Sequence, residues 1–520
     1  MNIADALYRA AQLYPDRIAS VHEGRTRTWS DMLRRVARLG GALRGRGIAT
    51  GERVALLGWN TDRYVESVLA VAWAGAVMVP LNTRLAIPEL AYQLDDAGVS
   101  ALIFDGGFEQ TAARLCEDRR LLRLRIAMEG AGTAAFADDY EALLNSAEPV
   151  GSVDRRPDDL LGIFYTGGTS GMPKGVMGTH ANMAYQMSVH TMNAGWTSET
   201  SFLHVLPMFH LGGLRSALCV TALGARHAYM PRFDLDQFLE RIARESINAS
   251  GLGPVMISWL LEHPRFADHD LSALKDLLYG TSPMPRSILQ RALKLLPGVR
   301  FTQMYGQTEN NGTITVLRPE EHIMDGPGAE RLSSAGRACR GTYARIVDSE
   351  GMEAPRGSPG EIVCRSPSVM TGYWNDPNQS AEAIREGWLH TGDIGYMDYD
   401  GYIFVVDRIK DMIVTGGENV FSSEVESAIS SLPGVAQVAV IGIPSEWWGE
   451  SVHAIVVPVQ GAQITEQAVI AQCRSRISGY KCPKTVEIRS EPLPLSGVNK
   501  ILKRMLREPY WEKRDSTDTV

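Results

Sequence analysis

The sequence predicts an α/β protein, with a large N-terminal domain of mostly parallel sheets and helices and a smaller α+β domain at the C-terminal end. Two observations carry this prediction. Apolar strand-like runs alternate with helical patterns over most of the chain, and the polar segment Asp407–Asp411 separates them from a compact last part. The 520 residues suffice for about two to four structural units of ordinary size.

The N-terminal elements follow one another in a simple order. Residues Ile3–Leu13 have the apolar spacing of an amphipathic helix. The run Arg53–Gly58 predicts a strand, Thr61–Gly75 a helix and Ala76–Pro80 a second strand. These three form a βαβ unit, which implies parallel pairing. Further strands are predicted at Ser100–Asp105 and Leu160–Tyr165.

The C-terminal part has a different pattern. A strand-like run, Gly401–Val406, precedes the polar segment, and a glycine pair and a predicted helix, Ser422–Leu432, follow it. Strands are then expected at Val435–Ile443 and His453–Val459. We therefore predict an N-terminal domain of residues 1–408 and a C-terminal domain of residues 409–520.

Composition and charge argue against several classes of protein. The net charge is -8, whereas a protein that binds DNA or RNA needs a basic face, so no nucleic-acid partner is expected. None of the six cysteines forms a C-x-x-C pair, which argues against a zinc site. The N-terminus lacks the apolar core of a signal peptide, and the longest apolar run, Val68–Leu81, is too short to span a membrane. We expect a cytoplasmic protein without a transmembrane segment.

A glycine-rich segment, Tyr165-Thr-Gly-Gly-Thr-Ser-Gly-Met-Pro-Lys-Gly175, gives the strongest functional signal. It follows an apolar strand, and its glycines allow backbone N–H groups to approach phosphate oxygens closely. Thr166, Thr169 and Ser170 can donate hydrogen bonds, and Lys174 can neutralise the outer phosphates. The segment has neither the Walker A pattern nor a G-x-S-x-G nucleophile elbow. It predicts a nucleotide phosphate-binding loop of another kind.

The segment resembles the signature Y-T-S-G-T-T-G-x-P-K-G of the adenylate-forming superfamily, which contains acyl-CoA synthetases, peptide-synthetase adenylation domains and beetle luciferases. Gly167 stands where serine is usual and Ser170 where threonine is common, and both changes keep a small size or a hydroxyl. Five further motifs resemble those of the superfamily, in the same order along the chain: Pro207–Gly213, Tyr305–Glu309, Thr391–Asp393, Arg408–Asp411 and Ser496–Arg504. Together they cover essentially the whole sequence and resemble the acyl-CoA synthetase branch.

The resemblance implies the reaction and the site. ATP, with Mg²⁺, and a small-molecule carboxylic acid would give acyl-AMP and pyrophosphate, and the acyl group would then pass to coenzyme A. Glu309 would bind Mg²⁺, which prefers hard oxygen ligands and often shares them with substrate phosphates. The implied ATP- and AMP-binding residues are Thr166, Gly167, Gly168, Thr169, Ser170, Lys174, Gly280, Thr281, Ser282, Tyr305, Gly306, Thr308, Asp393 and Arg408.

Several of these residue types suit their roles on physical grounds. Tyr305 offers an aromatic face for adenine, and Asp393 can accept hydrogen bonds from both ribose hydroxyls. Lys500 is the main catalytic candidate, because a fixed ammonium group stabilises the negative charge that develops when a carboxylate attacks the α-phosphorus. Val498 and Asn499 lie between Gly497 and this lysine, where the superfamily usually has T-G-K.

The resemblance also implies motion and a thiol channel. The smaller domain would be mobile and would rotate about the hinge residue Lys410 between the two half-reactions. Lys500 would then leave the site. Gly416 and Gly417 would take its place and line a channel for coenzyme A. A homodimer is a further expectation for the assembly.

The resemblance places the acyl pocket at His210, Gly251, Gly253, Gly280, Met304, Asn310 and Gly312. His210 would act as a gate to this pocket. Many of the residues are small, which predicts a roomy pocket, and none is a lysine or an arginine, which argues against a second carboxylate on the substrate. A medium-to-long fatty, aromatic or bulky alicyclic acid is favoured over acetate or malonate.

Three alternatives stay open. The first is an acyl- or aminoacyl-adenylating enzyme that loads a carrier protein. Amino-acid adenylation domains place an aspartate near the position of His210, whereas Met208, Phe209 and His210 are not acidic, and we expect no carrier domain after the lysine motif. The second is a freestanding acyl-AMP ligase, and the third is a binding module without activity.

Overall fold

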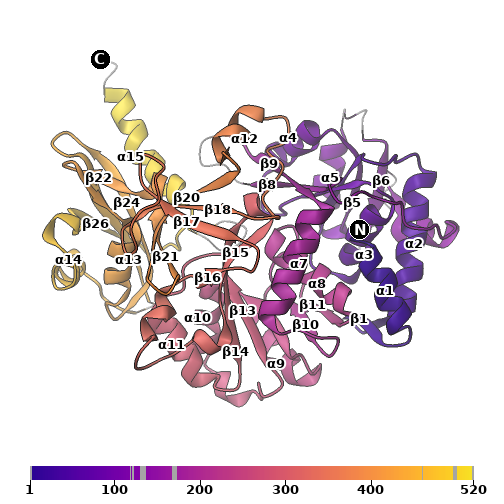
Figure 1. The fold of residues 1–520 in the computed structure, drawn as a ribbon, viewed down its shortest axis with the longest axis horizontal. Helices are drawn as coiled ribbons and strands as arrows, with labels where there is room; N and C mark the ends of the chain where they lie inside the picture. The colour runs from indigo at the N-terminus through magenta and orange to yellow at the C-terminus, as the bar shows by residue number, and fades with distance from the viewer. Residues whose placement is uncertain are drawn as a thin grey trace. The chain divides into compact units, whose positions relative to one another are not determined.

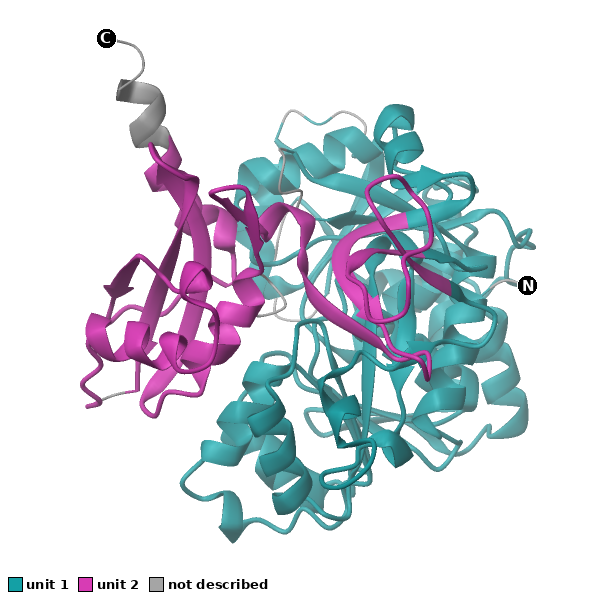
Figure 2. Cartoon of the chain, turned by 60° about the vertical axis from the view of Figure 1, so that its left-hand side comes forward, with its two compact units in different colours: residues 1–343, 364–389 teal, residues 344–363, 390–520 magenta. Residues whose placement is uncertain are grey.

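A computed structural model gives the fold and describes residues 3–117, 119, 122–128, 136–166, 172–459, 461–495 and 501–517. The chain forms two compact units (Figure 2). Unit 1 contains residues 1–343 and 364–389, and unit 2 contains residues 344–363 and 390–520. The chain passes from one to the other within strands β17 (Tyr343–Val347), β18 (Gly360–Arg365) and β20 (Trp388–Met397). The predicted boundary between residues 408 and 409 lies inside unit 2 and stays a prediction.

A seven-stranded sheet forms the first half of unit 1, in the order β7-β6-β5-β3-β4-β8-β9. All of its strand pairs are parallel except β8 with β9. The strands are β3 (Arg53–Leu57), β4 (Val77–Pro80), β5 (Val99–Phe104), β6 (Leu124–Ala127), β7 (Asp138–Asp139), β8 (Leu160–Thr166) and β9 (Lys174–Thr179).

A nine-stranded sheet forms the second half, in the order β16-β15-β14-β13-β12-β10-β11-β1-β2. Its central strands, from β14 to β1, pair in parallel, and antiparallel strands lie at both edges. The strands are β1 (Ile18–His22), β2 (Arg25–Thr28), β10 (Ser201–His204), β11 (Arg226–Tyr229), β12 (Ala249–Leu252), β13 (Asp276–Gly280), β14 (Arg300–Gln307), β15 (Gly312–Leu317) and β16 (Arg337–Ala338).

Helices cover both faces of each sheet in unit 1 (Figure 1). One continuous core joins both sheets to the helices between them, and two further cores lie on the outer faces. Side chains alternate between faces along a strand, so Phe202 of β10 belongs to the inner core and Leu203 to an outer one. The inner helices are α1 (Asp5–Leu13), α2 (Trp29–Gly45), α3 (Asp62–Trp73), α6 (Tyr140–Ser146), α7 (His180–Ala194) and α8 (Leu211–Leu223), and the outer ones are α4 (Ile87–Ala97), α5 (Glu109–Cys116), α9 (Leu235–Arg244), α10 (Pro254–Glu262) and α11 (Arg286–Leu295).

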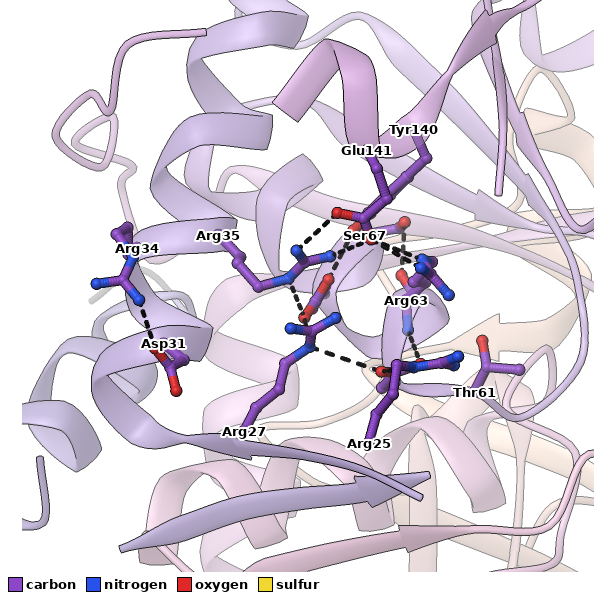
Figure 3. A network of polar contacts seen from close by, with 12 residues as sticks. Arg25, Arg27, Asp31, Arg34, Arg35, Thr61, Arg63, Ser67, Tyr140 and Glu141 are labelled. Carbon is purple, nitrogen blue, oxygen red and sulfur yellow. Dashed lines mark hydrogen bonds and ion pairs between the residues drawn. The ribbon is translucent and has the colours of Figure 1, made fainter. Parts of the chain in front are cut away.

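A polar network ties α2, α3, α6 and β2 together (Figure 3). Glu66 is completely buried and accepts hydrogen bonds from Arg35 (2.7 Å) and from the Tyr140 hydroxyl (2.9 Å). Arg35 also binds both carboxylate oxygens of Glu141, at 2.8 and 2.9 Å. Burial alone would raise the pKa of Glu141, but the hydrogen bonds and charge of Arg35 lower it to about 2. Each buried charge therefore has a partner, which offsets its desolvation.

Unit 2 contains a five-stranded sheet in the order β23-β22-β25-β24, with β26 on β25. Another five-stranded sheet runs β17-β18-β20-β19, with β21 on β20. Strand β19 (Ile384–Arg385) and helix α12 (Pro377–Ala383) belong to unit 1. The remaining strands of unit 2 are β21 (Ile403–Arg408), β22 (Ile413–Thr415), β23 (Glu418–Val420), β24 (Val435–Ser445), β25 (Gly449–Pro458) and β26 (Thr485–Ile488), and its helices are α13 (Ser422–Ser430), α14 (Glu466–Arg474) and α15 (Lys503–Thr517).

The structure confirms the predicted fold class and the predicted βαβ unit at β3, α3 and β4. The boundaries of these elements lie within a few residues of the predicted ones. The antiparallel edges of the nine-stranded sheet were not predicted, because short edge strands such as Arg337–Ala338 carry no periodic signal. Among the described residues, no helix is long and apolar enough to cross a membrane.

Buried histidines predict a pH-dependent stability. Burial lowers the pKa of His180 to about 4 and of His227 to about 3, and it lowers the pKa of His190 and His204 well below the usual value. Because the unfolded chain binds protons that these folded side chains do not, the free energy of unfolding should fall as the pH drops below about 6.5, by up to about 1.4 kcal/mol per pH unit for each histidine. Urea unfolding at a series of pH values measures this. A free energy that stays constant down to about pH 5 would contradict it.

Candidate active site

The centre of the nine-stranded sheet brings several predicted residues to one edge. Strands β12, β13 and β14 are parallel, and their carboxyl ends lead into Gly253, Thr281–Ser282 and Tyr305–Glu309. This edge is where ligands bind in open parallel sheets. Thr281 has a φ of +69°, which is uncommon for a residue with a β-carbon and is often found at functional sites.

A tyrosine that the sequence analysis did not identify lies at the centre of this region. The Tyr373 hydroxyl donates a hydrogen bond of 3.0 Å to the Glu309 carboxylate. The Lys174 ammonium nitrogen lies 5.1 Å from the centre of the Tyr373 ring. Burial and the nearby Glu309 charge raise the pKa of Tyr373, so the hydroxyl stays a donor at neutral pH. The predicted magnesium ligand and the predicted phosphate-binding lysine are thus held on two sides of one aromatic ring.

Backbone pairing holds Tyr373 in this place. Strands β8 and β9 form an antiparallel hairpin in which Thr166 is opposite Lys174. The segment Tyr373–Trp374 pairs with β9 of this hairpin. Tyr373 forms an antiparallel bridge with Val176, and the Trp374 N–H donates to the Gly175 carbonyl at 2.7 Å. The rest of the predicted phosphate loop, Gly167, Gly168, Thr169 and Ser170, lies outside the described residues.

The Glu309 segment is a tight connection between β14 and β15. Thr308 begins a short 3₁₀-helix that ends at Asn310, and the Asn311 N–H closes it on the Thr308 carbonyl at 2.7 Å. A β-carbon at Gly306 would lie 1.9 Å from the Gly312 carbonyl oxygen, so only glycine permits this crossing of the backbones. The carboxylate of Glu309 is therefore held by main-chain geometry as well as by Tyr373.

His210 lies at the start of α8, where it occupies the N-cap position. Its ring packs against Phe209, and burial, followed by the charge of Arg84, lowers its pKa to about 4. Among the described residues, nothing bonds to its Nε2 atom. A neutral imidazole with an unbound ring nitrogen suits a residue that contacts a substrate. Its role as a pocket gate stays a prediction.

The glycines predicted for the acyl pocket differ in what surrounds them. A β-carbon at Gly253 would meet ordinary contacts of 3.8 Å, and one at Gly251 would lie 3.2 Å from Leu206. At Gly280, however, a β-carbon would lie 2.3 Å from the Met304 carbonyl oxygen. This glycine is therefore required by the pairing of β13 with β14, and its small size does not indicate a roomy pocket.

Asn310 is fully buried and is held by its own loop. Its side-chain amide donates to the Thr313 carbonyl at 3.0 Å and accepts from the Ser368 hydroxyl at 3.2 Å. These bonds support a role in shaping the loop beside Glu309. Its contact with an acyl group stays a prediction.

A buried arginine that the sequence analysis missed lies against the predicted pocket residues. A β-carbon at Gly312, whose φ is +143°, would lie 1.8 Å from Nη1 of Arg215, and Nη2 of the same arginine is 4.0 Å from the Met304 sulfur. None of the predicted pocket residues is itself a cation, but Arg215, which the sequence analysis did not name, lies against two of them. Arg215 is distant in sequence from both residues, and only the packing of α8 against β14 and β15 brings it to them.

Two further predicted residues meet in unit 2. Asp393 and Arg408 are opposite each other in the antiparallel pair β20 and β21, and an ion pair of 3.3 Å joins them. Asp393 is buried, and its backbone N–H is bonded to the Thr391 hydroxyl at 3.1 Å. The sequence predicted both as nucleotide-binding residues but not their contact.

The predicted hinge and thiol channel also lie in unit 2. The carbonyl of Lys410 accepts a hydrogen bond of 3.0 Å from Arg507 of α15. Gly416 and Gly417, with φ values of +60° and +82°, form the two-residue turn between β22 and β23 that favours glycine at both positions. Lys500, the predicted catalytic residue, lies outside the described residues.

Only one predicted metal ligand is present at this site. No group of three or more histidine, cysteine or acidic side chains suited to a metal occurs in the part of the chain that the structure describes. A single carboxylate such as Glu309 fits Mg²⁺ that arrives with a nucleotide, because that ion takes most of its ligands from phosphates and water.

Two family models match most of the chain. The model of the family described as AMP-binding enzyme matches residues 7–374, and the model described as AMP-binding enzyme C-terminal domain matches residues 424–500. The first match contains the Lys174, Tyr373 and Glu309 positions.

Individual proteins are similar over nearly the full length. A feruloyl-CoA synthase of Amycolatopsis sp is 39% identical over 503 residues, which covers 96% of this chain and 98% of that protein. A fatty acid–acyl-carrier-protein ligase of Streptomyces coeruleorubidus is 33% identical, with 96% and 95% covered. The structure of o-succinylbenzoate CoA synthetase from Bacillus subtilis, in complex with its acyl-adenylate intermediate, superposes with a TM-score of 0.85 at 29% identity and covers 96% and 97% of the two chains.

The Tyr373–Glu309 contact gives a direct prediction. The substitution Tyr373→Phe removes the hydroxyl and leaves the ring beneath Lys174. Because a hydrogen bond to a charged group contributes about 1.5–3 kcal/mol, the affinity for Mg·ATP should fall by about 10- to 100-fold. Calorimetric titration with Mg·ATP measures it, and Tyr399→Phe, at a tyrosine that is 90% exposed, is the control. Equal affinities for the variant and the control would show that Tyr373 does not hold Glu309 for the metal.

Proposed function

Because this chain belongs to the AMP-binding enzyme family, we propose that it is an ATP-dependent acyl-CoA ligase. In the first half-reaction a carboxylate oxygen attacks the α-phosphorus of ATP, and acyl-AMP and pyrophosphate form. In the second, the thiol sulfur of coenzyme A attacks the acyl carbon, the bond to AMP breaks, and acyl-CoA and AMP leave. The thiol proton passes to solvent.

The grouping of Lys174, Tyr373 and Glu309 beside the carboxyl ends of β12–β14 is the observation that carries the proposal. A triphosphate needs a cation for its outer oxygens and a hard carboxylate ligand for its magnesium ion. Lys174 and Glu309 supply one each, and Tyr373 sets their spacing. Mg²⁺, when bound there with ATP, would neutralise phosphate charge.

The AMP half of the nucleotide would use further predicted residues. Tyr305 would stack on adenine, and Asp393 would accept hydrogen bonds from the ribose hydroxyls, with Arg408 holding the carboxylate in position. Thr281 and Ser282 would add hydroxyl donors from the end of β13. These roles are the ones that the resemblance of the motifs implies.

The acyl substrate in this proposal is an aromatic or medium-to-long aliphatic acid. Relatives named for feruloyl-CoA and for fatty acids support this class. The apolar neighbours of His210 and Gly251, which are Phe209 and Leu206, support an acid with a largely apolar body. We place the enzyme in the cytoplasm. All six cysteines are unpaired, which fits a reducing compartment. The homodimer stays a prediction.

A carrier-protein thiol is the second candidate acceptor. The similarity to a fatty acid–acyl-carrier-protein ligase supports this second candidate. Incubation with ATP, an acid panel and coenzyme A should give AMP, pyrophosphate and acyl-CoA in equal amounts. If acyl-AMP accumulated and coenzyme A did not consume it, the carrier-protein or freestanding-ligase alternative would replace the proposal.

The role of Lys500 is tested by the substitution Lys500→Ala. Its ammonium would serve only the transition state of adenylation, so acyl-AMP formation should fall by about 100-fold or more, while transfer from supplied acyl-AMP to coenzyme A should persist. Single-turnover assays of each half-reaction separate the two. The exposed Lys484 gives the control variant Lys484→Ala. Equal losses in both half-reactions would refute a role confined to adenylation.

The hinge is tested by the substitution Lys410→Pro. Proline restricts φ to about −65°, so rotation about this residue should be blocked. Adenylation should persist, and transfer to coenzyme A should fall by about tenfold or more. The matched variant Lys410→Ala keeps the backbone free and should behave as the parent in both steps. Normal transfer by the proline variant would place the hinge elsewhere.

A further inference from the structure

Arg215 is a buried cation without an anionic partner among the described residues. Its side chain, on α8, is 6% exposed. Nε donates to His190 Nδ1 at 3.0 Å, and Nη1 donates to the Gln186 side-chain oxygen at 3.3 Å. Nη2 reaches only the Met304 sulfur, a weak acceptor, at 4.0 Å. All three acceptors are neutral.

The other arginines that are buried in the described part of the chain have anionic partners. Arg63 and Arg241, each 9% exposed, bind the carboxylates of Glu141 and Glu245 at 2.8 Å and 2.7 Å. A buried guanidinium stays charged, and leaving it without an anion costs several kcal/mol. Burial lowers the pKa of Arg215, but arginine remains protonated at neutral pH. Arg215 therefore needs an anion that the described residues do not supply.

The position of the guanidinium points to the source of that anion. It contacts Met304 and lies against Gly312, and both belong to the predicted acyl pocket. Any side chain at Gly312 would displace Nη1, so this glycine makes room for the arginine. His210 precedes Arg215 by five residues, which is about 7.5 Å along the helix axis. The contacts with Met304 and Gly312 thus put Arg215 at the predicted acyl pocket, where the end of a substrate opposite to its reacting carboxylate would lie.

We propose that Arg215 determines specificity by binding an oxygen group at the far end of the acyl substrate. The unbalanced positive charge favours an anionic oxygen, so a second carboxylate or an acidic phenol is the class of group expected. Gln186 and His190 hold the guanidinium by Nη1 and Nε and leave at least two N–H groups of the nitrogens Nη1 and Nη2 for the ligand. The inference rests on the proposed acyl-CoA ligase function and names its substrate class.

The test compares acids that differ only at the far end. One pair is para-carboxycinnamate and para-isopropylcinnamate, and another is para-hydroxycinnamate and para-methylcinnamate. The ratio of kcat/KM values within each pair is measured from pyrophosphate release. The parent should favour the oxygen-bearing member by about 10- to 100-fold, as expected for hydrogen bonds to a charged group. The two pairs show whether the carboxylate or the phenol is the better ligand.

Variants show whether Arg215 is the cause. Arg215→Met removes the charge at similar volume and should lower both ratios by about 10- to 100-fold, whereas Arg215→Gln keeps donors and should lower the carboxylate ratio more than the phenol ratio. Arg241→Met, at a buried arginine of α9 that is paired with Glu245, should leave both ratios unchanged. Calorimetric binding of the same acids without ATP gives the ratios independently of catalysis.

The outcomes separate the inference from the function on which it rests. A parent that binds the alkyl acids as tightly as their oxygen-bearing partners overturns the inference. Equal losses for all acids in Arg215→Met, with unchanged ratios, also overturn it and assign the arginine a structural role. Acyl-CoA formation fails altogether only if the proposed function is wrong, and the binding ratios still decide the role of Arg215.

Discussion

The hydrogen bond between Tyr373 and Glu309 is the interaction on which the site depends. It joins a segment that pairs with β9 to the connection between β14 and β15, and so it links the two sheets of unit 1 at the point where their predicted ligands lie. Lys174, above the same ring, belongs to the hairpin of the first sheet. The predicted phosphate-binding lysine of one sheet and the predicted metal ligand of the other are thereby held at a fixed spacing.

The βαβ unit and most of the candidate site residues could be predicted from the sequence, because each depends on a short contiguous segment. The βαβ pattern around Arg53–Pro80 follows from periodicity, and the glycine-rich run and the Tyr305–Glu309 segment are contiguous motifs. Tyr373 could not be found in the same way, since its partner is 64 residues away and a lone tyrosine is an ordinary core residue. Its contact depends on backbone pairing, for which a single sequence has no local signal.

For the acyl pocket, the sequence analysis relied too much on the small size of the predicted residues. Gly280 and Gly312 suggested open space, but the first faces the backbone of Met304 and the second faces the guanidinium of Arg215. A small residue can mark a close approach by a neighbour as well as an empty pocket. The substrate class therefore depends on long-range packing, while the reaction class depends on contiguous motifs.

In the proposed reaction, the acid is activated by attack of its carboxylate on the α-phosphorus of ATP. Turnover of an acid labelled with ¹⁸O in its carboxylate, in the presence of ATP and coenzyme A, tests this most directly. One labelled oxygen should appear in AMP for each acyl-CoA formed, because the oxygen that bridges the acyl carbon and phosphorus stays with AMP. Label in inorganic phosphate, with ADP as the product, would contradict the account.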